Sequence, residues 1–291
     1  MITGPSWVAI LAFSIFAAFY GNGTAEQSLR STEGTATSFD GVEIVYSIQG
    51  KAEPTLVFIH GGFADRSFWS DQMKHFARYN HVIAIDLAGH GESGKNRKSW
   101  SITSFAEDVS AVIKKEKIRR AVLIGNSLGG PVALKTAHLV SETIVAVVAV
   151  DTLHDIGIRV PSSYYRERAD AFRKDFTGTM KKMVRSLFHP DTYPELMAQV
   201  ERRMLDNSPE MAVALMESFA NFDMAELLKN ISIPIRCING DLYPTQLEKN
   251  RGIYTDFDVV VLPNSGHYPM LENPELFNQH LETVLKELLI Q

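Results

Sequence analysis

Continuous apolar runs alternate with amphipathic segments along most of the chain. Six short runs are apolar at nearly every position, which is typical of strands buried on both faces of a parallel sheet. These runs are 55–59, 82–85, 121–124, 144–150, 233–238 and 258–262. Helical periodicity lies between and after them, at 68–79, 102–115, 128–140 and 274–289. We therefore expect an α/β fold in which helices cover both faces of a mostly parallel sheet.

A β-hairpin is predicted ahead of the first buried run. Residues 37–39 and 42–48 flank Asp40 and Gly41. An Asp-Gly pair between two strand-like runs is a strong hairpin signal. With these two strands the predicted sheet has eight, and the predicted core covers 38–151 and 230–291.

The strand pattern stops between these two parts of the core. Residues 152–229 instead carry Met, Phe, Leu and Val at helical spacing, and Ser208 before Pro209 is a typical helix start. We expect three or four helices here, inserted into a single catalytic domain.

The N-terminal segment has a different composition. Residues 7–20 are almost entirely apolar, and Gly23-x-Ala25 provides the small residues that a signal peptidase reads. We expect 1–25 to be a signal peptide, or an uncleaved anchor, although no Lys or Arg precedes the apolar run. Residues 26–37 are expected to form a linker. The protein would then be exported, periplasmic or secreted, with membrane contact only through this segment if it is uncleaved.

Composition and motif content give no reason to expect a nucleic acid, a metal or a cofactor. The 291 residues carry a net charge of −5, from 29 basic and 34 acidic side chains, which gives no reason to expect a nucleic-acid partner. The single cysteine, Cys237, lies in a predicted strand and has no intrachain partner for a disulfide. The chain has no His/Cys cluster with metal-ligand spacing and no glycine-rich phosphate loop, so neither a metal nor a cofactor is expected. The oligomeric state stays open.

The most informative motif follows the run 121–124. It reads Gly125-Asn126-Ser127-Leu128-Gly129 and leads directly into a predicted helix. A serine flanked by small residues at a strand-to-helix switch is typical of the nucleophile elbow of a serine hydrolase. The turn is so sharp that only small neighbours avoid a clash, and the helix N-terminus favours developing negative charge.

Other polar residues also follow predicted strands. In an open parallel sheet the ligand crevice lies at the carboxyl ends of the strands, so these residues are expected at one edge. They are the turn His60-Gly61-Gly62-Phe63, the turn from Asp86 to Ser93, Asp151, Asp241 and His267.

Together these motifs identify the chain, from Ser38 onward, as similar to the α/β-hydrolase fold superfamily. The resemblance implies that Ser127 is the nucleophile and His267 the general base. It also implies an oxyanion hole made by the backbone N–H of Leu128 and that of Gly62 or Phe63. Segment 152–229 would be a lid over the nucleophile, and His60 and His90 would brace their loops.

The triad acid departs from the family pattern. Relatives usually carry it in the turn after the seventh strand, where this chain has Tyr243 followed by Pro244. A tyrosine is not an anionic partner for imidazolium near neutral pH. Asp241 lies in the same turn but two residues early, and Asp151 ends the sixth strand, from which some members supply the acid. We favour Asp151 and keep Asp241 as the alternative.

The expected function is that of a serine hydrolase, a carboxylic ester hydrolase acting on a small or medium apolar ester through an acyl-enzyme. The same residues would also suit cleavage of a lactone, an amide or a carbon–carbon bond, and Asn126 occurs in relatives that cleave carbon–carbon bonds. The alternative from another class is a non-catalytic small-molecule binding protein on the same fold. Tyr243 in the usual acid position is its main support.

Overall fold

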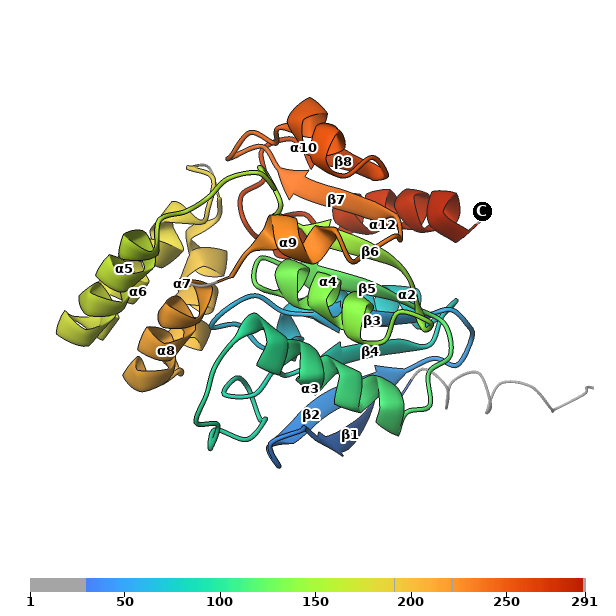
Figure 1. Ribbon diagram of the computed structural model, residues 1–291, viewed down its shortest axis with the longest axis horizontal. Coiled ribbons are helices and arrows are strands. Elements are labelled where there is room, and N and C mark those ends of the chain that lie inside the picture. The colour runs from blue at the N-terminus through green and yellow to red at the C-terminus, as the bar shows by residue number, and fades with distance from the viewer. Residues whose placement is uncertain (1–29, 191, 221, 290–291) are drawn as a thin grey trace, which may run out of the picture.

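The computed structural model describes residues 30–190, 192–220 and 222–289. A single eight-stranded sheet runs through it in the order β1-β2-β4-β3-β5-β6-β7-β8 (Figure 1). Its strands are β1 (Thr32–Thr37), β2 (Glu43–Gln49), β3 (Thr55–Ile59), β4 (Val82–Ile85), β5 (Ala121–Asn126), β6 (Ile144–Val150), β7 (Ile235–Gly240) and β8 (Phe257–Leu262). β2 pairs antiparallel with both β1 and β4, and the strands from β4 through β3, β5, β6 and β7 to β8 pair parallel.

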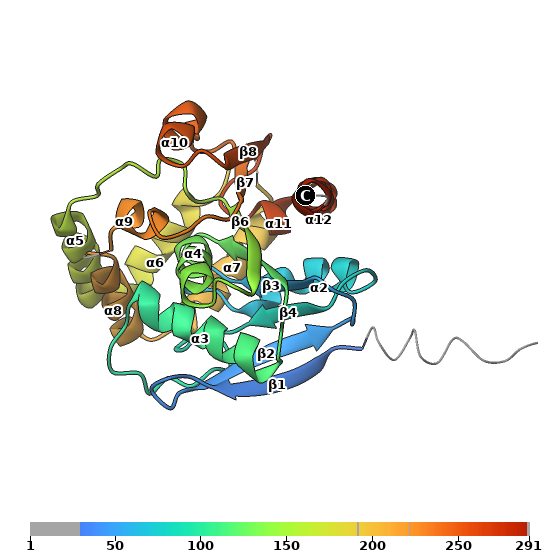
Figure 2. The ribbon, with the colours of Figure 1, turned by 45° about the vertical axis from the view of Figure 1, so that its right-hand side comes forward.

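Helices cover both faces of this sheet. α3 and α4 pack against each other on one face, and α2 and α12 pack on the other (Figure 2). The core helices are the short turn η1 (Arg66–Trp69), α2 (Ser70–Phe76), α3 (Ile102–Lys115), α4 (Gly129–Leu139), α10 (Leu247–Ile253), α11 (Pro269–Glu272) and α12 (Pro274–Leu289). The predicted fold class, a mostly parallel eight-stranded sheet with helices on both faces, is confirmed.

The strand register brings the expected site residues together at the carboxyl ends of the parallel strands. Ile59 pairs with Gly125, Asn126 pairs with Val150, and Val150 pairs with Ile238. The ends of β3, β5, β6 and β7 are therefore level. The loops that follow these strands must meet at this edge.

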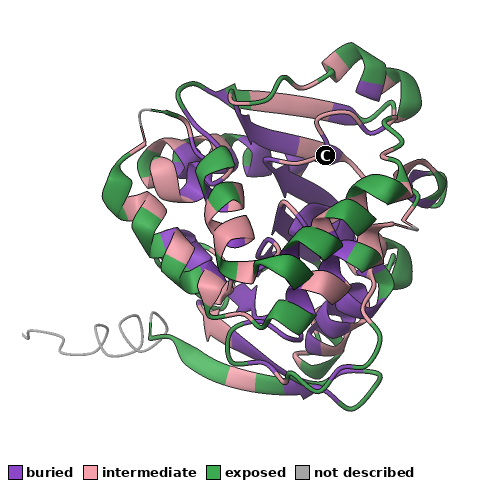
Figure 3. Ribbon diagram, turned by 90° about the vertical axis from the view of Figure 1, so that its left-hand side faces the viewer, coloured by how far each residue is buried: buried purple, intermediate pink, exposed green. Residues whose placement is uncertain are grey.

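The sheet is the centre of the hydrophobic core. Every residue of β3 and β5 is buried, and the strands are mostly purple in Figure 3. On the α2 side, Phe58 packs against Trp69 and Phe76, with ring centroids 5.1 and 6.4 Å apart. Burial on both faces explains why these strands are continuous apolar runs in the sequence.

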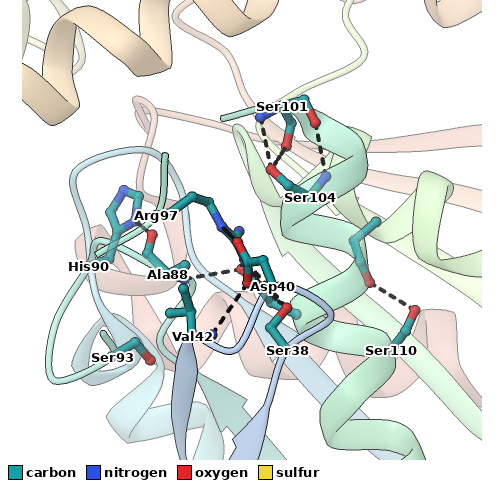
Figure 4. Close-up of polar contacts among 12 residues, drawn as sticks. Ser38, Asp40, Val42, Ala88, His90, Ser93, Arg97, Ser101, Ser104 and Ser110 are labelled. Atoms are coloured by element: carbon teal, nitrogen blue, oxygen red, sulfur yellow. Dashed lines mark hydrogen bonds and ion pairs between the residues drawn. The ribbon is translucent and has the colours of Figure 1, made fainter. Parts of the chain in front are cut away.

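A buried ion-pair network fixes the loop after β4. The Arg97 guanidinium donates to both carboxylate oxygens of Asp108 in α3 and to Asp40 in the β1–β2 turn. Asp108 also accepts from the Ser38 hydroxyl and the Ala88 N–H (Figure 4). Because Asp108 is fully buried, removing one partner would leave a buried charge without compensation. The network therefore holds the hairpin, α3 and the loop together.

The prediction of a linker over 26–37 is wrong for residues 32–37, because they form β1. β1 is an edge strand in which only Ala36 is buried. Its small and polar residues join the sheet through backbone hydrogen bonds to β2, so hydrophobic patterning gave no signal. The expected signal peptide or anchor, 1–25, lies outside the described residues. No helix in the described part of the chain is long and apolar enough to cross a membrane.

The segment between β6 and β7 contains more helices than expected. It forms five rather than three or four: α5 (Ser162–Lys174), α6 (Phe176–Ser186), α7 (Pro194–Leu205), α8 (Pro209–Phe219) and α9 (Met224–Leu228). The apolar spacing runs unbroken from Tyr165 to Leu187, but Asp175 interrupts the helix and caps α6 by accepting from the Gly178 N–H. α5 to α8 lie at the carboxyl-end side of the sheet (Figure 1).

Candidate active site

Ser127 sits on a sharp turn that leaves no room for a side chain two positions before it or two positions after it. Its φ is +52°, a left-handed conformation that costs energy for a residue other than glycine. A Cβ placed on Gly125 would lie 2.1 Å from the Gly129 carbonyl oxygen, and one on Gly129 would lie 2.4 Å from that of Ile59. The two glycines therefore make the sharp passage from β5 into α4 possible.

His267 follows β8 and faces the end of β6. Its Nδ1 lies 2.6 Å from Oδ2 of Asp151. The backbone also holds this residue, because its N–H donates to the Leu187 carbonyl at 2.7 Å. With the ring proton on Nδ1 facing the carboxylate, Nε2 of the neutral imidazole is left as an acceptor.

Asp151 is a buried carboxylate with several donors. Its Oδ1 accepts from the Gly240 N–H at 3.0 Å, and His154 Nε2 lies 3.6 Å from the same oxygen. Burial opposes its ionisation, but hydrogen bonds from His154 and His267 outweigh burial and lower the pKa to about 2. Asp151 is therefore ionised at neutral pH beside the His267 ring.

Asp241, the other candidate acid, binds the backbone instead. Its carboxylate accepts the N–H groups of Asn264 at 3.0 Å and Ser265 at 3.1 Å. These hydrogen bonds, that of Asn264 first, hold the pKa of Asp241 below its usual value. Asp241 thus anchors the turn that precedes His267. Tyr243, in the usual acid position, donates its hydroxyl to the Ser186 carbonyl at 3.1 Å.

Asn126 connects the three strand ends. Its side-chain amide donates to the Val150 carbonyl at 3.0 Å and to the His267 carbonyl at 2.9 Å. It therefore holds the residue before Asp151 and His267 itself, while it precedes Ser127 in the chain. The sequence marks Asn126 only as a neighbour of the serine, because contacts over 24 and 141 positions leave no local pattern.

The turn after β3 lies against the elbow. A Cβ on Gly61 would be 3.2 Å from that of Ser127, and one on Gly62 would be 3.9 Å from the Leu128 side chain. Phe63 has a φ of +65°, and Asn207 donates to its carbonyl at 2.8 Å. The structure therefore brings together Leu128, Gly62 and Phe63, the residues expected for an oxyanion hole.

His60 and His90 are buried behind this turn. His60 Nε2 accepts the Leu87 N–H at 3.0 Å, and its Nδ1 lies 2.7 Å from the Gly61 carbonyl oxygen. His90 Nδ1 lies 3.0 Å from the Ala88 carbonyl oxygen. Burial lowers the pKa of both rings, that of His90 to about 3, so both are neutral at physiological pH. Through these contacts, His60 and His90 brace the loops that follow β3 and β4.

A cavity of about 650 Å³ opens beside Ser127 and Leu128. Its far wall comes from the loop after β6 and from α5, α8 and α9. Tyr165 and Phe219 stack on each other there, with centroids 5.6 Å apart. The apolar side chains of the wall also include Ile156, Ile158, Val160, Phe222 and Met224. Polar and charged side chains, among them His154, Asp155 and Arg159, line the cavity as well. A concave site that combines an apolar wall with polar groups is typical of a small-molecule site.

A smaller cavity, of about 340 Å³, lies on the other side of Phe63. It is lined by paired charges: Arg66 forms ion pairs with Asp86 and Glu92. Ser127 does not line it. Within residues 30–190, 192–220 and 222–289, no three His, Cys, Asp or Glu side chains come together as a possible metal site.

The fold and the arrangement at the carboxyl ends of the strands are those of the α/β hydrolases. A model of the alpha/beta hydrolase family matches residues 56–280, and the chain belongs to this family. It is similar to 3-oxoadipate enol-lactonase 2 of Acinetobacter baylyi, with 26% identity over 87% of this chain and 96% of that protein. It is also similar to pimeloyl-[acyl-carrier protein] methyl ester esterase of Nitrosospira multiformis, with 23% identity over 77% of this chain and 91% of that protein.

A solved structure supports the fold. The thermophilic esterase of Thermogutta terrifontis superimposes with a TM-score of 0.77, covering 88% of this chain and 99% of that one, at 23% identity. At that identity the likeness concerns the fold alone. The family and its relatives together support hydrolase activity.

Proposed function

We propose that the protein is a serine hydrolase of carboxylic esters that works through an acyl-enzyme on Ser127. The observation that carries the proposal is the 2.6 Å contact between His267 Nδ1 and a buried, ionised Asp151. This pair lies at the strand ends that also present a serine on a strained turn. A base oriented by a carboxylate and placed near such a serine is the arrangement that activates a hydroxyl nucleophile.

In the proposed reaction, Ser127 Oγ attacks the ester carbonyl while His267 Nε2 takes its proton. The backbone N–H of Leu128, with that of Gly62 or Phe63, stabilises the oxyanion of the tetrahedral intermediate. Collapse of the intermediate breaks the ester C–O bond, and His267 returns the proton to the leaving alcohol. A water molecule, deprotonated by His267, then attacks the acyl-enzyme and releases the carboxylic acid.

Asp151 is the proposed acid, in preference to Asp241. Its carboxylate holds the proton of His267 on Nδ1 and stabilises the imidazolium that forms during each transfer. The two N–H groups bound by Asp241 support the view that its role is to shape the loop.

The cavity beside Ser127 supports a small or medium apolar substrate. Its Tyr165 and Phe219 rings and aliphatic wall would bind an apolar acyl or alcohol group. The segment that forms this wall, 152–229, is proposed to act as the lid of the site.

A cyclic ester is a second candidate substrate. The similarity to an enol-lactonase over 96% of that protein favours it, because a lactone presents the same acyl carbon to the same nucleophile. The contact between Asp151 and His267 weighs against a purely binding role, whose support was the absence of an acid from the usual position.

A substrate panel tests the proposal. We expect the wild type to hydrolyse p-nitrophenyl esters of graded acyl length, a γ-lactone, or both, and we expect a p-nitroanilide and a β-diketone to react more slowly. Ser127→Ala should lower kcat by about 10⁴-fold or more. Ser70→Ala is the matched control, since this exposed serine donates its hydroxyl to the Ser67 carbonyl and does not line the cavity beside Ser127. Equal ester hydrolysis by Ser127→Ala and wild type would refute the proposal.

A further inference from the structure

A second histidine faces the carboxylate of Asp151. His267 Nδ1 lies 2.6 Å from Oδ2, and His154 Nε2 lies 3.6 Å from Oδ1. The Asp151 side chain is 1% exposed, whereas that of His154 is 24% exposed and lines the cavity beside Ser127. One buried carboxylate is thus flanked by two imidazoles, and one of them can exchange protons with solvent in the cavity.

The contacts of His154 determine which nitrogen carries its proton. The Asn239 amide donates to the Thr245 hydroxyl oxygen at 2.8 Å and to the Thr152 carbonyl at 3.2 Å. The Thr245 proton is therefore directed to its other neighbour, Nδ1 of His154, at 3.1 Å. A neutral imidazole that accepts at Nδ1 carries its proton on Nε2, the nitrogen that faces Asp151.

The other groups around His154 are neutral or already paired. The Tyr243 ring meets it edge-on at 6.3 Å, and α10 reaches only its carbonyl, through Gln246 and Asn250. On the cavity side, Asp155 pairs with Lys249 at 2.6 Å, and Arg159 lies 4.0 Å from Asp223. Asp151 is therefore the charged group to which a proton on His154 couples most directly.

We infer that His154 is a positioning residue that shares the Asp151 carboxylate with His267 and so sets the pH range in which His267 acts as base. The inference rests on the proposed function. A proton taken up by His154 would form an ion pair with Oδ1 and offset the charge that stabilises imidazolium at His267. The shared carboxylate thereby couples the two rings, and we expect the acid limb of the activity profile to lie at lower pH with His154 present than without it.

Two substitutions separate the polar contact with Asp151 from the capacity to take up a proton. His154→Gln keeps an N–H donor but takes up no proton, and His154→Leu removes both. In kcat/KM profiles against pH, the acid limb should move upward in the order wild type, His154→Gln, His154→Leu, by roughly half a unit to one unit in total. His138→Gln is the matched control, because this exposed histidine contacts the Asn230 carbonyl and lies away from Asp151, so its profile should stay that of the wild type.

A merely structural role for His154 predicts a different result. Activity would then fall by the same factor at every pH, and the acid limb would not move. That outcome, or a downward shift in His154→Leu, overturns the inference.

A spectroscopic titration keeps the inference testable without any substrate. NMR resonances of the imidazoles in the full chain should show His267 responding to two ionisations in the wild type and to one in His154→Gln. A single ionisation in the wild type would overturn the inference even if esters are hydrolysed. If no ester or lactone is hydrolysed, the proposed function fails, while this titration still decides the role of His154.

Discussion

Among single residues, the proposed mechanism depends most on the fixed orientation of the Asp151 carboxylate. Its φ of +44° turns the side chain away from the line of β6, and the Gly240 N–H and His267 hold its two oxygens apart. A carboxylate fixed on both oxygens cannot rotate away from the imidazole. Its orientation therefore exists before any substrate binds, which is what an electrostatic partner of a general base requires.

Replacement of each candidate acid by asparagine gives the first prediction. Asp151→Asn should lower kcat by about 10³- to 10⁴-fold, because a neutral amide neither holds the tautomer of His267 nor stabilises its cation. Asp241→Asn should cost less than about tenfold, since it weakens hydrogen bonds to two backbone N–H groups but leaves the carboxylate beside His267. Steady-state kinetics on both variants, with circular dichroism to check folding, decide between them. An inactive, folded Asp241→Asn with an active Asp151→Asn would reverse the assignment.

The same carboxylate predicts an acid-dependent loss of stability. Since the pKa of Asp151 falls from 3.8 in the unfolded chain to about 2, its ionised form stabilises the fold above about pH 4. This contribution is lost as pH falls from 4 to 2, and it is on the order of 2 kcal/mol. In urea unfolding, the difference in free energy of unfolding between wild type and Asp151→Asn should shrink by this amount between pH 5 and pH 2. A difference that does not change with pH would show that Asp151 is not held as described.

Sequence patterns predicted the individual polar residues of the site better than their partners. Ser127 and His267 follow strands in recognisable motifs, so their place at the edge could be expected. The sequence favoured Asp151 but left Asp241 as an alternative, because the choice depends on the direction of two side chains in irregular loops. The Asn126 and His154 contacts were invisible for the same reason.

Among the elements, the passage from β5 to α4 is tightly constrained by backbone contacts. The backbone of Gly129 runs so close to β3 that its position leaves no room for a methyl group. Gly125 and Gly129 are thus required by geometry, whereas a Cβ on Gly252 would meet nothing within 4 Å.

Alanine substitutions at one constrained glycine and one unconstrained glycine test this demand. Gly125→Ala should destabilise the protein by about 3 kcal/mol or more and abolish activity, because its Cβ would overlap backbone atoms of the elbow. Gly252→Ala in α10 is the matched control, since its Cβ would meet nothing within 4 Å. It should be neutral or stabilise the protein by up to about 1 kcal/mol. Urea unfolding measures both, and equal effects would show that the elbow is not constrained as the structure indicates.

Prediction of the elements succeeded where burial on both faces left a continuous apolar run. The bounds of β3, β4, β6, α3 and α12 match those expected from the sequence. The first hairpin strand was expected at 37–39 and lies at 32–37, because an exposed edge strand buries one side chain and its stability comes from backbone pairing. The break between α5 and α6 was missed because Asp175 falls between apolar positions without disturbing their spacing.

At the scale of the whole molecule, the helical segment and the core share the site. Asn207, between α7 and α8, bonds the Phe63 carbonyl, and Leu187, after α6, accepts from the His267 N–H. The segment therefore touches both the turn that would hold the oxyanion and the loop that carries the base. Its helices form the cavity wall, so the size of substrate depends on the position of the segment as a whole.

Export of the protein is a prediction at the same scale. The apolar run 7–20 followed by Gly23-x-Ala25 predicts cleavage after Ala25. N-terminal sequencing of the protein from its native host should find Glu26 as the first residue, in an extracytoplasmic fraction. A mature N-terminus at Met1 would contradict cleavage and favour the anchor.

The proposed mechanism requires that Ser127 is an activated nucleophile. Reaction of the purified full chain with a fluorophosphonate probe, followed by peptide mass spectrometry, tests it most directly. We expect one equivalent of label on Ser127, none in Ser127→Ala, and strongly slowed labelling in Asp151→Asn. A well-folded wild type that takes up no label, or a Ser127→Ala variant that labels equally, would contradict it.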